Sequence, residues 1–140
     1  MDKLEFKIDE RRHGGQIYHV VRVFINDSDL VEMVREFERP FAGTIAGEYD
    51  GLNQEDLWTS LTKKDSGSKK RILECECGCD GCWPLLAKVQ MDEEKVLWTN
   101  FEQPHRGQES ETYWDYSKFG PFEFDKVQYL NEIEKLKPKS

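Results

Sequence analysis

All four cysteines of the 140-residue chain fall between Cys75 and Cys82. Within this stretch, Asp80-Gly81 is a two-residue hairpin signal, because glycine accepts the positive φ that such a turn needs. Alternate side chains of an extended strand share a face, so Cys75, Cys77 and Cys79 would point the same way. Cys79 and Cys82 would then be neighbours across the turn. The sequence therefore predicts a hairpin whose tip gathers four thiols on one face.

Two kinds of apolar periodicity predict the remaining elements. Alternation with a period of two predicts strands at residues 4–9, 17–25, 72–77, 83–91 and 95–103. Helical spacing predicts a first helix ending near Arg39, a short helix capped by Asn53 and a last helix capped by Asp125. The resulting order, ββ-α-α-βββ-α, predicts an α+β fold. We expect an antiparallel sheet of about five strands with helices packed mainly on one side.

The last helix and the segment before it have distinct patterns. Residues 113–124 hold six aromatic side chains around Gly120-Pro121, which predicts irregular chain filling the core, with one short strand at most. In the last helix, apolar side chains recur at helical spacing and predict the buried stripe: Val127, Leu130, Ile133 and Leu136. We expect a single domain over residues 1–140, with an exposed polar loop at 63–71 and a tail at 137–140.

Charge and hydropathy limit the classes of function. The net charge is −8 and the mean hydropathy −0.79. An acidic surface argues against nonspecific nucleic-acid binding and against anionic membranes, but is compatible with a basic protein partner. No apolar run approaches the ~20 residues that span a bilayer, and the N-terminus has no apolar signal segment. We therefore expect a cytoplasmic protein with reduced thiols.

The hairpin after the cysteines brings a second group of residues into the same region. If the chain turns at residues 92–94, residues whose numbers sum to about 186 face each other. His105 and Arg106 would then lie beside the cysteine tip, near Trp83. We take Trp83 and Arg106 as candidate binding residues.

Three readings of the cysteines stay open. Zinc prefers thiolate and imidazole ligands in a tetrahedron, which Cys75, Cys77, Cys79 and Cys82, or three of them with His105, could supply. The spacing differs from that of zinc fingers, which hold two Cys-x-x-Cys pairs well apart. Alternatively, Cys79 and Cys82 could form a thiol–disulfide redox pair, although nearby carboxylates would raise the thiol pKa values. In the third reading the thiols simply pack a tight hairpin.

Two longer motifs carry a resemblance to a known family. They are Cys-x-Cys-Gly-x-x-Gly-Cys-Trp-Pro-Leu from residue 75 and Phe-x-Gln-Pro-His-Arg from residue 101. With residues 96–98, 114–116 and 119–122, they make the chain resemble a family of small, uncharacterised bacterial proteins. The resemblance implies a bacterial source, with Cys75, Cys77 and Cys82 as the usual cysteines and Cys79 as optional. It implies no catalytic role for any residue.

The sequence contains no phosphate-binding glycine loop, nucleophile elbow or His-Glu-x-x-His motif. Glu102 and His105, close together at a strand end, are a weak candidate for an acid–base pair. We therefore predict a small, non-enzymatic binding or regulatory protein. The alternatives are a structural zinc protein and a thiol redox protein.

Overall fold

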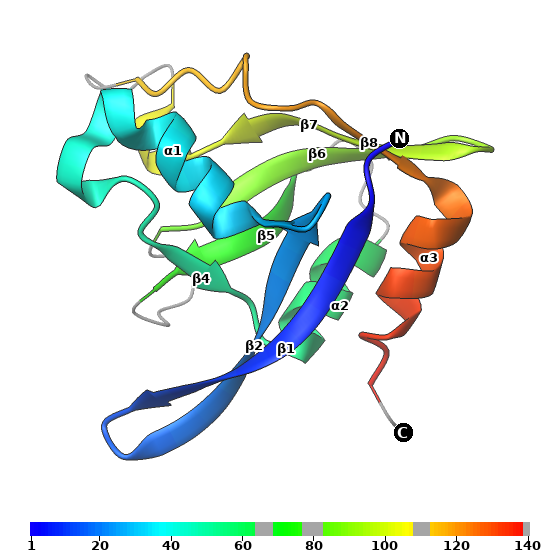
Figure 1. Ribbon diagram of the computed structural model, residues 1–140, viewed down its shortest axis with the longest axis horizontal. Helices are drawn as coiled ribbons and strands as arrows, with labels where there is room; N and C mark the ends of the chain where they lie inside the picture. Colours follow the sequence, from blue (N-terminus) through cyan, green and yellow to red (C-terminus); the bar gives the residue numbers. More distant parts are fainter. Residues whose placement is uncertain (64–68, 77–82, 108–112, 139–140) are drawn as a thin grey trace.

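The computed structural model describes residues 1–63, 69–76, 83–107 and 113–138 and confirms an α+β fold (Figure 1). The elements are, in chain order, β1 (Leu4–His13), β2 (Gln16–Ile25), β3 (Ser28–Asp29), α1 (Leu30–Ala42), η1 (Gly43–Ile45), β4 (Tyr49–Gly51), α2 (Gln54–Thr62), β5 (Lys70–Cys75), β6 (Leu85–Met91), β7 (Lys95–Glu102), η2 (Pro104–Arg106), β8 (Phe122–Asp125) and α3 (Lys126–Glu134). All five predicted strands are present.

The strands form two antiparallel sheets. The second has five strands, as many as predicted, but only β5, β6 and β7 of the predicted strands belong to it. One sheet has the order β1-β2-β3, and the other has the order β4-β5-β6-β7-β8. The prediction did not foresee that β1 and β2 would form a sheet of their own. It also missed β4, which is too short to show an alternating pattern. The predicted loop at 63–71 overlaps β5, which begins at Lys70, and residues 64–68 lie outside the described part.

The two sheets meet where β4 passes β2. Val21 of β2 donates its N–H to the carbonyl of Leu52 at 2.7 Å. Gly51 lies so close to β2 that a Cβ atom on it would stand 2.0 Å from the Val21 carbonyl oxygen. Only glycine fits this crossing without moving backbone. Fully buried side chains of both sheets, of α2 and of the residue after β4 pack into one core around it, among them Leu4, Ile25, Leu52, Leu57, Leu73, Leu85, Trp98 and Phe124.

Helix α1 does not end before Pro40, as the sequence predicted. It continues to Ala42, and the Gly43 N–H returns to the Arg39 carbonyl to close the last turn. Proline removes one N–H donor and disfavours helix at the residue before it. Here the lost hydrogen bond is in the final turn of the helix. Its acceptor would have been the carbonyl of Glu36, four residues before the proline. Because Glu36 is exposed, that carbonyl can face solvent. The proline therefore shortens the helix less than the local rule suggests.

Helix α3 begins as predicted but turns a different face to the core. The Asp125 side chain accepts from the Gln128 N–H at 3.0 Å, which confirms the N-cap. Val127 and Leu130 are 68% and 43% exposed, so the predicted apolar stripe is wrong at these two positions, while Ile133 and Leu136 are buried as expected. The helix is oriented instead by polar contacts with β1.

Those contacts provide hydrogen-bond partners for the backbone groups at the edge of β1. The side-chain amide of Gln128 accepts from the Leu4 N–H at 3.1 Å and donates to the Leu4 carbonyl at 2.5 Å. Glu132, which is buried, accepts from the Phe6 N–H at 3.0 Å. A buried backbone N–H or carbonyl without a hydrogen-bond partner costs free energy. The need to pair this edge therefore constrains the orientation of α3 more than the burial of Val127 and Leu130 would. Within the described residues, no helix combines the length and apolar character needed to cross a bilayer.

The crossing of β4 and β2 gives a direct test of the fold. We expect Gly51→Ala to lower the free energy of unfolding by about 3 kcal/mol or more, because a Cβ there requires backbone to move. Gly107→Ala is the matched control, since the nearest atom to its added Cβ would be 3.6 Å away. Urea denaturation of both variants measures the difference. Equal stability of the two variants would show that the sheets do not meet at this crossing.

Candidate functional site

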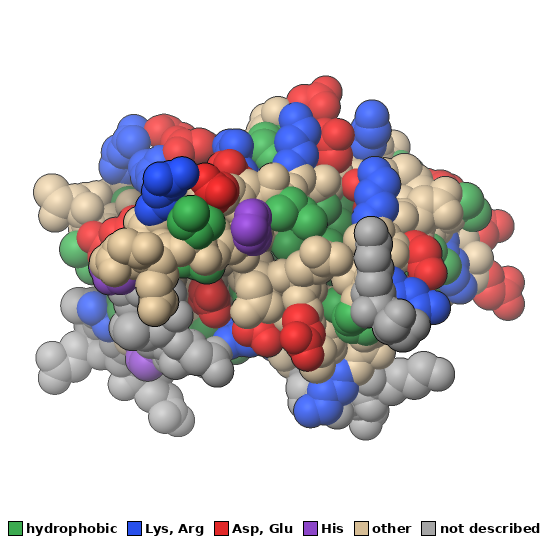
Figure 2. Space-filling view, turned by 90° about the horizontal axis from the view of Figure 1, so that it is seen from below, with side chains coloured by type: hydrophobic (Ala, Val, Ile, Leu, Met, Phe, Trp, Pro, Cys, Tyr) green, Lys and Arg blue, Asp and Glu red, His purple; other side chains and the backbone are tan. Residues whose placement is uncertain are grey.

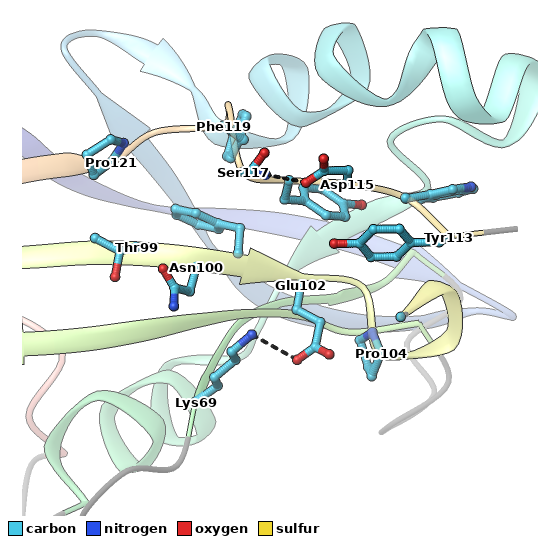
Figure 3. A pocket seen from close by; sticks show the side chains of 14 residues that line it. Lys69, Thr99, Asn100, Glu102, Pro104, Tyr113, Asp115, Ser117, Phe119 and Pro121 are labelled. Carbon is cyan, nitrogen blue, oxygen red and sulfur yellow. Dashed lines mark hydrogen bonds and ion pairs between the residues drawn. The ribbon is translucent and has the colours of Figure 1, made fainter. Parts of the chain in front are cut away.

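A cavity of about 820 Å³ lies between the second half of β7 and the segment 113–121 (Figure 3). It exists because β8 pairs with β7 only as far as Trp98, opposite Phe122. Beyond Trp98 the irregular segment forms the opposite wall. Figure 3 shows Thr99, Asn100 and Glu102 on β7 and Tyr113, Asp115 and Ser117 on the segment across from it, with the Glu102 side chain turned toward Lys69 and away from Asp115.

A β-bulge in β7 shapes one wall of this cavity. Leu86 pairs with Glu102 and Lys88 with Thr99, so β7 contains one residue more than β6 between these two pairs. Asn100 in this interval has φ of 50°, a left-handed conformation that asparagine tolerates better than most residues. The bulge bends β7 next to the cavity, and bulges of this kind are common beside functional sites.

The charges of the cavity are unevenly balanced. Lys69 Nζ lies 3.0 Å from Glu102 Oε1, and both side chains are partly exposed. Asp115 is exposed, and its carboxylate accepts from the Ser117 N–H at 2.9 Å. The hydrogen bonds from Ser117 lower the pKa of Asp115 below its ordinary value, so this carboxylate is ionised at neutral pH. Among the described residues it has no ion-pair partner within 4 Å.

A buried polar cluster supports the wall from behind. Glu38 of α1 is completely buried and accepts hydrogen bonds from the hydroxyl groups of Tyr49, at 2.5 Å, and Tyr116. It also accepts from the Gly47 N–H at 2.9 Å. Gln103, buried at the end of β7, donates to the Tyr49 hydroxyl at 3.1 Å. The cluster thereby joins α1, β4 and β7 to Tyr116, which lines the cavity.

Burial dominates the ionisation of this cluster. Desolvation raises the pKa of Glu38, and the hydrogen bonds from Tyr116, Tyr49 and Gly47 only partly oppose that rise. Burial also raises the pKa values of both tyrosines, so both phenols stay protonated and remain donors.

Glu38 was not predicted as buried. The signal was present, since position 38 lies four residues after Val34 and eight after Leu30, both buried on the same helical face.

An aromatic and cationic stack adjoins the cavity through Trp114, which lines it. Trp83 and His105 stack with ring centroids 5.7 Å apart and planes 3° from parallel. The Arg106 guanidinium lies 4.9 Å from the Trp83 ring and 5.5 Å from the Trp114 ring. Gln103 accepts from the His105 N–H at 3.2 Å and so ties the stack to the buried cluster. The structure thus brings together Trp83, His105 and Arg106, as the turn at residues 92–94 predicted.

The cysteine predictions stay largely open. Cys75 lies at the end of β5, opposite Tyr49, and is partly buried. Cys77, Cys79 and Cys82 lie outside the described residues, so the zinc and the redox readings both stay predictions. Within the described residues alone, no three histidine, cysteine or acidic side chains are grouped to hold a metal ion. The candidate acid–base pair does not form, because Glu102 contacts Lys69 and His105 stacks on Trp83.

Comparison with known proteins gives no relative. No family model matches the chain, and the searches of curated proteins and of solved structures found no match either. The resemblance to the small bacterial family therefore stays a prediction. The function has to be argued from the geometry of the cavity and its surroundings.

The raised pKa of Glu38 predicts a specific pH dependence of stability. An acid whose pKa is higher in the folded state contributes stability that is fully present below its ordinary value of 4.5. That stability is lost as the pH rises through the folded-state value. We therefore expect the natural protein to lose stability relative to Glu38→Gln as the pH rises from 4.5 toward neutrality.

Urea denaturation of both proteins across this pH range checks the prediction. Taking the difference between the two proteins cancels other titrating groups, including Glu74, whose pKa is also raised by burial. Parallel stability curves would mean that Glu38 titrates in the folded protein as it does in the unfolded chain.

Proposed function

We propose that this protein is a small, non-enzymatic binding protein whose cavity beside β7 takes a cationic side chain of a basic protein partner. The observation that carries the proposal is Asp115. It is an ionised carboxylate on the wall of the cavity, and within the described residues no cation lies within 4 Å of it, although Lys118 is near enough to interact with its charge. The net charge of −8 would favour the approach of a basic partner to this site.

The lining of the cavity suits a guanidinium or ammonium group. The exposed Tyr113 and the buried Trp114 directly precede Asp115 in sequence, and all three line the cavity. Aromatic faces attract cations, and a carboxylate beside them adds a charge-assisted hydrogen bond. Glu102 is partly neutralised by Lys69, so Asp115 is the stronger attractor in the unbound protein.

This proposal predicts that one charge controls the affinity. Asp115→Asn keeps an oxygen that can accept from the Ser117 N–H but removes the negative charge. We expect it to weaken binding of a short arginine-rich peptide by about three- to tenfold at low salt. A peptide with citrulline in place of arginine should bind weakly to both proteins. Isothermal titration calorimetry measures the affinities.

Glu93→Gln is the matched control, since it removes one exposed carboxylate in the turn between β6 and β7. Its affinity should stay close to that of the natural protein. Equal weakening by both substitutions would mean that only the overall charge attracts the peptide. Backbone amide shifts on peptide addition should concentrate at residues 99–102 and 113–117, and shifts elsewhere would move the site.

A second candidate function is a structural zinc site at the cysteine hairpin. The observation that favours it is the stack of Trp83 on His105, because Trp83 directly follows Cys82 in the chain. His105 is thus held beside the residue next to a cysteine. Three cysteines and this imidazole would suit a tetrahedral zinc ion.

Metal analysis tests the second candidate. We expect about one equivalent of zinc per purified chain and a lower unfolding temperature after chelation. His105→Ala should reduce the bound zinc, while His13→Ala, at an exposed turn, should not. Metal-free protein whose unfolding temperature does not change on chelation would reject a structural zinc ion.

A further inference from the structure

The outer part of the β1–β2 hairpin has a different environment from its base. We call residues 8–17 the outer arm. In Figure 1 this arm extends away from the rest of the chain, on the opposite side of the molecule from β7. Ile8 and Ile17 are 54% and 53% exposed, whereas Phe6 at the base is 8% exposed. Figure 2 shows the molecule from below, the side toward which the arm extends, with apolar side chains exposed among charged ones.

The backbone edge of β1 is open along this arm. The N–H groups of Leu4 and Phe6 point away from β2, because they donate to side chains of α3. Strand alternation turns the N–H groups of Ile8, Glu10 and Arg12 toward the same side. Glu10 donates its N–H to the neighbouring Asp9 carboxylate at 2.9 Å and accepts from the Arg11 guanidinium at 3.2 Å, contacts within the arm that strand pairing would replace, and no strand pairs with this edge within the described residues. The helix thus covers only the first half of the edge.

We propose that the outer arms of two copies of this chain pair edge to edge, antiparallel, with Glu10 facing Glu10 across a two-fold axis. Three facing pairs would form, Ile8 with Arg12, Glu10 with Glu10, and Arg12 with Ile8. They would supply about six backbone hydrogen bonds. Because α3 covers Leu4 and Phe6, the pairing cannot extend toward the base, which fixes its length.

The opposite charges of Asp9 and Arg11 favour a second copy as the occupant of this edge. The outward N–H groups allow pairing only in steps of two residues. In the register centred on Glu10, Asp9 of each copy faces Arg11 of the other copy. A shift of one step in either direction places Asp9 against Asp9, or Arg11 against Arg11. Arg11 is already ordered by ion pairs to Asp9 at 2.7 Å and Asp50 at 2.8 Å, so little side-chain freedom is lost. At Asp9 and Arg11 the edge is therefore complementary to itself in the register centred on Glu10, while the two Glu10 carboxylates meet at the axis.

The same register covers the exposed isoleucines. Within one chain, Arg12 faces Ile17 across the hairpin and Ile8 faces Val21. In the paired sheet, Ile8 of one copy, then Arg12 and Ile17 of the other, would lie in one row across the strands. The aliphatic stem of Arg12 would pack between the two isoleucines. The two Glu10 carboxylates at the axis would have His19 beside them in each chain, since Glu10 faces His19 in the ladder.

Sedimentation equilibrium of the full chain tests the pairing. We expect a reversible monomer–dimer equilibrium at high micromolar concentration. Ile8→Lys would place lysine opposite Arg12 of the second copy and should leave the protein monomeric at the concentration where the natural protein is dimeric. Val127→Lys, an apolar-to-lysine change at an exposed site on α3, should leave the dimer intact. A natural protein that is monomeric at every concentration would overturn the proposal.

Cysteine cross-linking checks the register without depending on the folding of Ile8→Lys. Glu10→Cys should form a covalent dimer under mild oxidation, above the background given by the four native cysteines. Arg12→Cys alone should not, while a mixture of Ile8→Cys and Arg12→Cys chains should form the mixed dimer. A dimer that Ile8→Lys leaves unchanged, with no cross-link through position 10, would place the contact on another surface.

Discussion

The contact that the rest of this structure depends on is the crossing of β4 over β2 at Gly51. The two sheets share no strand. They meet at this close backbone approach with its hydrogen bond from Val21 to Leu52, and again where the Asp2 N–H donates to the Glu123 carbonyl at 2.7 Å. β4 has only three residues, and its other end carries Tyr49. Once Gly51 is fixed against β2, the Tyr49 hydroxyl is also fixed, and with it the buried cluster around Glu38. The geometry of the cavity wall thus depends on a glycine far from the cavity itself.

The buried cluster explains how a segment without regular structure can form a wall. Residues 113–121 have few backbone hydrogen bonds to hold them, apart from Trp114 to Arg106 and Phe119 to Tyr116. Tyr116 donates to Glu38, and Phe119 packs against Phe101 at 4.9 Å between ring centroids. A buried carboxyl group is costly unless its hydrogen bonds are satisfied, and Glu38 has three donors. Such a polar cluster specifies one position for the segment, whereas apolar packing alone would allow several.

The sequence predicted well the features that depend on residues close together in the chain, such as helix caps and the pairing across a short turn. The turn at residues 92–94 determined which residues of β6 and β7 face each other, so the approach of His105 to Trp83 followed from local counting. The caps at Asn53 and Asp125 are likewise local. The split into two sheets and the exposure of Val127 depend on contacts between distant segments, whereas the burial of Glu38 could have been inferred from its helical spacing to Leu30 and Val34. Val127 is exposed because Gln128 and Glu132 bond to β1, more than 120 residues away in the chain. No periodicity within α3 carries that information. Asp115 could be read as a polar residue among aromatics, but the cavity that gives it a role exists only because β8 begins no earlier than Phe122.

Both proposed interaction sites lie where a strand extends beyond the neighbouring strand or helix that contacts its edge. The second half of β7 extends past β8, and the outer half of β1 extends past α3. An uncovered strand edge can pair with other chains, and proteins prevent this with bulges, charges or covering side chains.

At β7 the bulge at Asn100 bends the strand, and the segment 113–121 lies across from it. What remains is a cavity suited to a side chain and not to a strand. At β1 no bulge interrupts the ladder between Leu4 and His13. A regular edge with alternating charges favours a strand of matching charge order, and the chain itself contains one. The difference between the two edges is the physical reason for assigning a cationic side chain to one and a second copy to the other.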